Sequence, residues 1–495
     1  MNEIKNFFYD YLSLLTGRFS TILFSIITFT MVIRLLNPEQ FGIFNLFLLV
    51  IQIGLLFSAN WTTSAMIRFG KEEVISDGTI TKTFWARALI LSITLPVFLF
   101  VMLTFRNKIA NYIGLPSSHI HLVIVYFITL SIFSLLLYPY QALGRMKAFS
   151  FIPAFEKMIY CLLLSLLYLK VFPRKASSVI IFIIFASIFS NLLLFILFEK
   201  KIIIPIKISI TTLKKIFHFS WPALFGGASG YVVNWIDIIV IKMYLTVFSV
   251  GVYSVAYGIY NYLMTAPLLW VNLVSLMLTG FLVRKREDLI IRYVKRLIPQ
   301  LIFFWSLFVS LIMVLSEPIF SIWVGKKYEL AVYPFIILTA GLVFRGITCA
   351  YTPLYSVYLM PKRYHITNIF IALINLMGDF ILIPHYGIIG AAISTTGAFF
   401  ISSLIFLIMA NYKLKIVNFS PIFCSIPVVA CFIISLLVDN SVARLVFFGL
   451  IFLISIVIAR RYQLFKKEDI TMLEPVKMPS IFKKVITKVV YVLSS

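Results

Sequence analysis

Residues 243–283 read MYLTVFSVGVYSVAYGIYNYLMTAPLLWVNLVSLMLTGFLV, which is 41 consecutive positions without an Asp, Glu, Lys or Arg. One membrane crossing takes about 20 apolar residues. We therefore divide the run at residues 249–251 and expect Pro267 to kink the long helix that follows. The whole chain is similar in character, with 61% hydrophobic and 12% charged residues. A soluble fold of 495 residues could not hide so much apolar surface, which excludes a soluble enzyme.

The apolar runs predict an all-α polytopic membrane protein with about 14 transmembrane helices. The predicted spans are residues 11–35, 43–67, 86–105, 120–143, 150–170, 177–198, 219–242, 250–282, 297–316, 332–357, 366–384, 388–411, 417–438 and 443–459. The first run is too long for the apolar region of a signal peptide and lacks a small-x-small cleavage site. We therefore interpret it as the first span.

The net charge of +25 follows the predicted topology. With a cytoplasmic N-terminus, the inner segments hold 31 Lys and Arg residues, the outer segments hold 10, and two lie within spans. This bias agrees with the positive-inside rule and predicts that both termini are cytoplasmic. Because topology accounts for the basic residues, we expect no nucleic-acid partner.

A weak internal repeat divides the chain into two halves. Aligning Gly42 with Gly251 sets a register of 209 residues, and each glycine lies where one apolar span has ended and the next begins. The repeat predicts two six-helix lobes with two extra C-terminal helices, and transporters with parallel repeats place their substrate between the lobes. The predicted parts are an N-lobe at 1–198, an amphipathic cytoplasmic linker at 199–218, a C-lobe at 219–411, spans 13 and 14 at 412–460, and a basic cytoplasmic tail at 461–495.

Five segments carry a resemblance to a known family. They are RLLNPEQFGIF at 34–44, SWPALF at 220–225, WIDIIV at 235–240, VGVYSVAY at 250–257 and IPHYGIIGAAIS at 383–394. Together they resemble the Wzx-type polysaccharide (O-antigen or capsule) flippases of the multidrug/oligosaccharidyl-lipid/polysaccharide exporter superfamily, over residues 5–465. The resemblance implies two lobes around a central cavity, alternating access, a polyprenyl-diphosphate-linked oligosaccharide as substrate, the bacterial cytoplasmic (inner) membrane as location, and no covalent chemistry.

Two arginines within predicted spans are candidate substrate-binding residues. Arg345 lies near the middle of the span 332–357, too deep to reach the interface easily, and Arg18 lies about two turns into the first span. The planar guanidinium group suits a diphosphate, because it donates several hydrogen bonds and keeps its charge. The alternative for Arg345 is an ion pair inside the helix bundle, and for Arg18 it is contact with the inner headgroups.

Two aspartates within spans are candidates for ion coupling or ion pairing. Asp237 lies in the segment WIDIIV, where the family has an Asp, and Asp379 follows Asn375 by one helical turn. A carboxylate in a partly dry cavity can exchange H+ or hold Na+, and it can also pair with an arginine in the cavity. The third possibility for Asp237 and Asp379 is an exposed position near the outer end of the cavity.

The remaining chemistry-bearing residues predict no metal site and no cofactor. The four cysteines lie in apolar runs, and His119 and His121 have too few potential ligands nearby. The chain lacks a P-loop and a GxSxG motif, so we expect a transporter and not an enzyme. The alternatives are a drug or cation antiporter, a peptidoglycan-precursor flippase, and a membrane-embedded glycan polymerase or ligase. A flippase would have membrane lipids as partners, and a polysaccharide polymerase and chain-length proteins are further candidates.

Overall fold

The computed structural model describes residues 2–199, 202, 204–358, 360–466 and 468–469. Within these residues the chain is helical and has no strand, as the sequence predicts. The contacts divide the chain into two compact units, Met1–Ser254 (unit 1) and Val255–Ser495 (unit 2), which are described separately.

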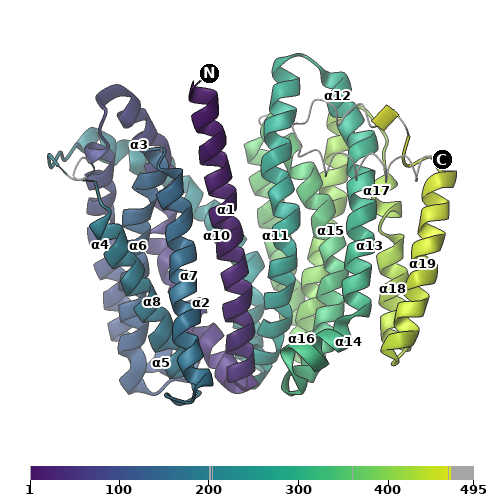
Figure 1. The fold of residues 1–495 in the computed structure, drawn as a ribbon, viewed down its shortest axis with the longest axis horizontal. Helices are drawn as coiled ribbons and strands as arrows, with labels where there is room; N and C mark the ends of the chain where they lie inside the picture. The colour runs from purple at the N-terminus through teal and green to yellow at the C-terminus, as the bar shows by residue number, and fades with distance from the viewer. Residues whose placement is uncertain (1, 200–201, 203, 359, 467, 470–495) are drawn as a thin grey trace. The chain divides into compact units, whose positions relative to one another are not determined.

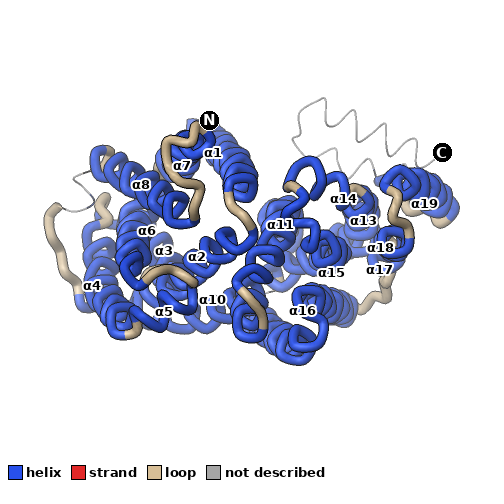
Figure 2. The backbone as a smooth tube through the Cα atoms, turned by 90° about the horizontal axis from the view of Figure 1, so that it is seen from below, coloured by secondary structure: helices blue, strands red, loops and turns tan. Residues whose placement is uncertain are grey.

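Unit 1 is a bundle of long helices (Figure 1). Its elements are α1 (Asn2–Leu35), α2 (Pro38–Ser58), η1 (Asn60–Thr62), α3 (Thr63–Asp77), α4 (Thr81–Thr104), α5 (Arg106–Ile113), η2 (Ser117–His119), α6 (Ile120–Ala142), α7 (Met146–Tyr168), α8 (Ala176–Ile196), α10 (Ile210–Tyr244) and the start of α11 (Val247–Val283). α1 packs along α7, and α8 packs against α6 and α7 (Figure 2). The Asn37 side chain caps α2 by accepting a hydrogen bond from the backbone N–H of Gln40, and Pro38 occupies the first helical position.

Unit 2 contains the rest of α11 and a second group of long helices. Its elements are α12 (Glu287–Arg292), the π-helical turn η3 (Tyr293–Leu297), α13 (Ile298–Val314), α14 (Ser316–Pro318), η4 (Ile319–Val324), η5 (Lys326–Ala331), α15 (Val332–Val357), α16 (Pro361–Leu414), α17 (Ser420–Phe423), α18 (Ile426–Leu437) and α19 (Ser441–Arg461). α15 packs along α16, α13 packs against α15 and α18, and α18 packs against α19. This arrangement makes α15 a central helix of the unit.

The observed helices agree with the predicted spans. Among the described residues, 12 helices are long and apolar enough to cross a membrane. One of these contains two predicted spans, because α16 turns at Gly387, whose φ of 60° and ψ of −140° lie outside the helical region. The predicted span 219–242 lies within α10, which has 35 residues. The 12 helices give the fourteen predicted spans when α16 is counted as two crossings and α10 is added.

One predicted boundary is wrong. The second span ends at Ser58 and not at residue 67, because the backbone breaks at the short η1 turn before α3 begins. The second half of the predicted linker is helical and continues into the predicted span 219–242, since α10 runs without interruption from Ile210 to Tyr244. Ile216 on this segment is buried, whereas Lys214 and Lys215 are exposed. Residues 200, 201 and 203 of the linker and 470–495 of the tail lie outside the described residues.

The two glycines that define the sequence repeat are in contact with one another in unit 1. α2 begins at Pro38 and α11 begins at Val247, and these positions are equivalent in the 209-residue register. A Cβ atom on Gly42 would overlap the carbonyl oxygen of Val247, and one on Gly251 would overlap the carbonyl oxygen of Pro38. The contact is therefore symmetric, and it requires glycine on both sides because the two helix backbones touch.

Unit boundaries and repeat boundaries differ. α10 packs against α2, α3 and α4, so the contacts place residues 210–254 in unit 1, whereas the repeat places 219–242 in the C-lobe. The division into lobes at 198 and 219 rests on sequence and stays a prediction.

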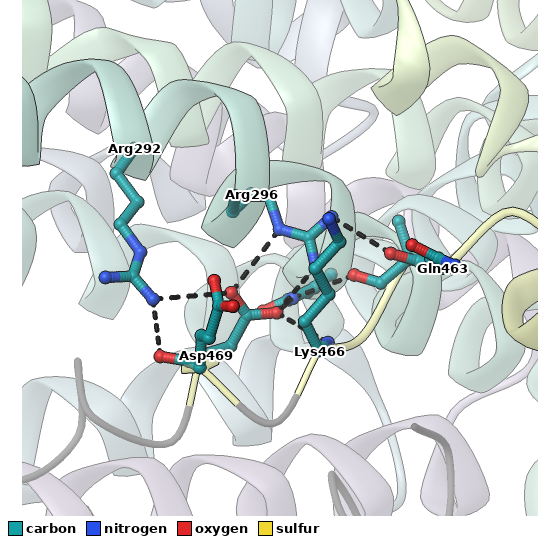
Figure 3. A network of polar contacts seen from close by, with 8 residues as sticks. Arg292, Arg296, Gln463, Lys466 and Asp469 are labelled. Carbon is teal, nitrogen blue, oxygen red and sulfur yellow. Dashed lines mark hydrogen bonds and ion pairs between the residues drawn. The ribbon is translucent and has the colours of Figure 1, made fainter. Parts of the chain in front are cut away.

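A short segment after α19 returns to the start of α13, and we call its described residues, 463–466 and 468–469, the C-terminal strap (Figure 3). The Asp469 carboxylate, which is 7% exposed, accepts hydrogen bonds from Arg296 at 2.8 Å and from Gln300 at 2.7 Å. Arg292 lies 3.7 Å from the same carboxylate. The ring of Phe465 packs between those of Phe303 and Phe304. Arg296 and Gln300 also donate hydrogen bonds to the backbone carbonyls of Gln463 and Leu464, so a buried carboxylate, a phenyl ring and backbone contacts together hold the strap.

We expect Asp469→Asn to loosen the strap. Burial raises the pKa of the Asp469 carboxyl group, but hydrogen bonds from Arg296 and the backbone of Lys466 outweigh this effect and lower its pKa below the ordinary 3.8. The ionised form is therefore favoured by folding, and its contribution is present above about pH 4 and disappears as the pH falls through the lowered pKa. A hydrogen bond to a charged group contributes about 1.5–3 kcal/mol. Tryptic cleavage after Lys466 at pH 7 should be faster in the variant.

The exposed pair Arg286–Asp288 supplies the control, because surface ion pairs contribute little. Asp288→Asn should leave cleavage after Lys466 unchanged. Equal cleavage rates for Asp469→Asn and the unmodified protein would show that Asp469 does not hold the strap.

Candidate functional site

Arg345 is the central residue of the candidate site in unit 2. It lies in the middle of α15 and is half-buried. Its guanidinium group lies over the ring of Phe399 on α16, with 5.3 Å between Cζ and the ring centroid. Arg345 forms no ion pair with any residue that the structure describes. A cation–π contact contributes about 0.5–2 kcal/mol and does not neutralise the charge. The guanidinium group is therefore available to an anion.

Aromatic rings extend from Arg345 in a series. The ring of Phe399 stacks on Tyr260 with centroids 6.0 Å apart and planes 5° apart, and Tyr260 stacks on Tyr257 at 5.5 Å. Tyr257 and Tyr260 belong to α11, and all three rings are buried. Because each ring stacks on the next, Phe399 is held in place and presents a fixed ring face to the Arg345 guanidinium group.

Asp379 and Asn375 do not pair with Arg345. Asp379 is fully buried in the first half of α16, and its carboxylate accepts a hydrogen bond from the Asn375 side-chain amide at 3.2 Å. The backbone carbonyl of Asn375 accepts a hydrogen bond from the Ser394 hydroxyl at 2.8 Å, which ties the two halves of α16 together. The expected alternative of an exposed Asp379 is wrong, whereas its role in ion coupling stays a prediction.

Asp237 lies in unit 1, close to the turn between α10 and α11. It is 2% exposed, and its carboxylate accepts a short hydrogen bond from the hydroxyl group of Tyr253. This bond joins the end of α10 to the first turns of α11. An exposed position is therefore wrong for Asp237 as well, and the contact agrees with a role in holding the two helices.

Arg18 is exposed on α1. It is the third residue of the apolar part of α1, Thr16–Leu35, and no ion pair joins it to another described side chain. An exposed arginine near the end of a span can contact either headgroups or substrate, so both readings of Arg18 stay open.

The sequence reasoning missed Arg87. It is counted among the 31 basic residues of the inner segments although it falls at the start of the predicted span 86–105, and in the structure it lies within α4 and is fully buried. Its guanidinium group donates hydrogen bonds to the Thr62 hydroxyl at 3.1 Å, the Ser134 carbonyl at 3.0 Å and the Ser134 hydroxyl at 2.8 Å. It also lies over the ring of Tyr138. Arg87 thus stabilises the break at η1 through neutral partners, and unlike the half-buried Arg345 it has no exposed surface.

Lys157 is also deeper than the inner-segment count assumes. It lies near the middle of α7, with its Nζ atom 3.9 Å from the carboxylate of the buried Glu156. Lys157 is thus a second cation near the middle of a span, but unlike Arg345 it has a counter-ion, on the neighbouring residue.

The fold defines a class of protein: a helical, multi-pass membrane protein. The chain is similar to the solved "Lipid II flippase MurJ, inward closed conformation", with a TM-score of 0.69, 16% identity, and coverage of 92% of this chain and 100% of the other. It is also similar to an inward-facing multidrug resistance MATE family transporter of the MOP superfamily, with a TM-score of 0.63, 13% identity, and coverage of 80% and 94%. At these identities the likeness concerns the fold.

Residues 8–265 match the family described as "Polysaccharide biosynthesis protein", and the chain belongs to this family. The resemblance drawn from the five sequence segments is thereby confirmed. A curated relative from Haloferax volcanii, "Probable low-salt glycan biosynthesis flippase Agl15", is 22% identical over 200 residues, or 40% of this chain. The match spans about 42% of that relative's length.

Proposed function

We propose that the protein flips a lipid-diphosphate-linked oligosaccharide repeat unit across the cytoplasmic membrane by alternating access. The repeat unit would serve assembly of a surface polysaccharide such as O-antigen or capsule. Family membership and the transporter fold support the class of activity. The observation that carries the proposal is Arg345, a half-buried arginine in the middle of a span with no carboxylate partner among the described residues.

Arg345 and its aromatic neighbours have defined roles in this proposal. The guanidinium group binds the diphosphate through parallel hydrogen bonds, because its donors match the geometry of phosphate oxygens. Phe399 fixes the plane of the guanidinium group, and the stacked Tyr260 holds Phe399. Arg18 would contact the phosphate as the substrate enters, and Asp237 and Asp379 would exchange H+ or Na+ during the cycle. The substrate crosses unchanged, so no covalent step is required.

The charge of the candidate site favours this function over drug or cation antiport. A cationic drug needs acidic groups around it, whereas Arg345 presents an unneutralised positive charge. A peptidoglycan-precursor flippase would also bind a lipid diphosphate, and the chemistry of Arg345 fits both substrates. The bacterial inner membrane, cytoplasmic termini, and partnership with a polymerase and chain-length proteins belong to the same proposal.

Deletion of the gene tests the function directly. We expect deleted cells to accumulate lipid-linked repeat units on the cytoplasmic side while synthesis continues, because the headgroup cannot cross the apolar core unaided. The measurement is extraction of labelled lipid-linked glycan, together with the amount of glycan at the surface. Normal surface glycan in a deletion strain without a paralogue would refute the proposal, and accumulation of a peptidoglycan precursor would indicate the other flippase activity.

A further inference from the structure

A groove of about 530 Å³ runs along unit 1 where α1, α7 and α8 meet. Its walls are almost entirely apolar and include Phe24, Phe151, Phe155, Met158, Leu193 and Leu197. Phe151 and Leu197 are each 48% exposed, so the groove is open to the surroundings at these residues. Figure 2 shows α1 and α7 side by side in unit 1. No part of the candidate site contributes to this groove.

One end of the groove carries a positive charge. Lys147 lines it at the second residue of α7, where the helix enters the membrane, and its side chain is exposed. No carboxylate of the described residues forms an ion pair with Lys147. The nearby Glu199 is already paired with Arg145 at 2.9 Å. The charge at this end is therefore not neutralised within unit 1.

The depth of the groove matches one leaflet. Along α7 the lining runs from Lys147 to Met158, which is about 16 Å at 1.5 Å per residue. Half of the hydrocarbon core measures about 15 Å. A hydrocarbon chain that starts at the headgroup level beside Lys147 would thus reach the bilayer midplane beside Met158.

We propose that this groove binds an acyl chain of an anionic phospholipid, with the lipid phosphate beside Lys147. The apolar walls accept the chain, the lysine recognises the phosphate, and the depth fits a chain from a single leaflet. A bound lipid would fill the space between α1, α7 and α8. The proposal does not depend on which substrate the protein transports.

The test uses the full chain, purified in detergent, freed of lipid, and titrated separately with phosphatidylglycerol, phosphatidylcholine or a polyprenyl phosphate. Native mass spectrometry counts the bound lipid molecules. We expect one tightly bound phosphatidylglycerol and weaker binding of phosphatidylcholine. Lys147→Ser should weaken phosphatidylglycerol binding about fivefold, the ratio that corresponds to about 1 kcal/mol for a basic residue at an anionic surface. Lys147→Arg should retain binding, since it keeps the charge.

Two further variants make the test specific. Lys71 on α3 is exposed, lies outside the groove and forms no ion pair with the described residues, so Lys71→Ser should leave binding unchanged. Ala148 lines the groove, and Ala148→Phe should displace the lipid by filling the space. Equal binding of phosphatidylglycerol and phosphatidylcholine would overturn the proposal. An equal loss of phosphatidylglycerol binding in Lys147→Ser and Lys71→Ser would overturn it as well. Preference for a polyprenyl phosphate over phosphatidylglycerol would overturn it too, by assigning the groove to a substrate-type lipid.

Discussion

Cells that carry Arg345→Ala are expected to contain near-normal amounts of the protein and to lack surface glycan. We expect near-normal stability because no described carboxylate pairs with Arg345. Its loss therefore leaves no described carboxylate unpaired. The cation–π contact with Phe399 disappears, at a cost of about 0.5–2 kcal/mol. Loss of charge-assisted hydrogen bonds to a phosphate costs about 1.5–3 kcal/mol, which corresponds to at least a tenfold loss of transport. The measurement is complementation of the deletion strain, with protein quantified in the membrane.

Three further variants separate the roles at this site. Arg345→Lys keeps the charge without the planar donors, so we expect partial activity. Phe399→Leu keeps the charge and removes the ring face, so it should weaken transport less than Arg345→Ala. Arg444→Ala is the contrasting case, because that buried arginine lies 3.8 Å from the Glu317 carboxylate and its loss should lower the amount of folded protein. Normal transport by Arg345→Ala would refute the anion site. Rescue of a missing Arg345→Ala protein by neutralising Asp379 would indicate a bundle ion pair.

The second large effect is expected for Gly251→Ala. The added Cβ atom would overlap the backbone carbonyl oxygen of Pro38 and approach the amide nitrogen of Gly42 to 2.9 Å. Backbone atoms at a helix crossing cannot move aside as a flexible side chain can, so α2 and α11 must separate. Overpacking of this kind costs about 1–3 kcal/mol and sometimes more. We expect a lower midpoint of thermal unfolding and less protein in the membrane, and Gly42→Ala should behave in the same way.

Gly280 provides the matched control on the same helix. A Cβ atom on Gly280 would meet nothing within 4 Å. Because Ala is favoured over Gly in a helix interior by about 0.5–1 kcal/mol, Gly280→Ala should be neutral or slightly stabilising. If Gly251→Ala were as stable as Gly280→Ala, the close crossing of α2 and α11 would be incorrect.

Much of the fold could be predicted because membrane spans are encoded locally. The length of an apolar run sets the length of a helix, and this rule placed the predicted spans close to the observed helices. The Gly42–Gly251 register, found as a weak sequence pattern, corresponds to two helices that begin at equivalent residues. The predicted end of the second span was wrong because the sequence after Ser58 stays fairly apolar, although the backbone breaks there. That break is stabilised by Arg87, a residue 25 positions away from Thr62.

The candidate site was predictable only in part. The sequence singled out Arg345, Arg18, Asp237 and Asp379 as ionisable groups in apolar surroundings, and the structure shows that their environments differ. Both aspartates are buried and hydrogen-bonded, whereas Arg18 is exposed. The aromatic neighbours of Arg345 could not be predicted, because Phe399 lies 54 residues away on another helix. The sequence contains many aromatic residues and nothing that marks this one.

The sequence by itself determined that the chain is a helical membrane protein, where its helices run, and on which predicted side its basic residues gather. These properties depend on the free energy of transferring each segment from water to lipid. This free energy is a sum of contributions from residues that are neighbours in the sequence. Tertiary structure alone decided what each buried charge does. Arg87 is satisfied by Ser134, Asp469 is held by Arg296, and Arg345 remains without a carboxylate partner among the described residues. The physical reason is that the free energy of a buried charge depends on the atoms packed around it, and those atoms come from distant parts of the chain.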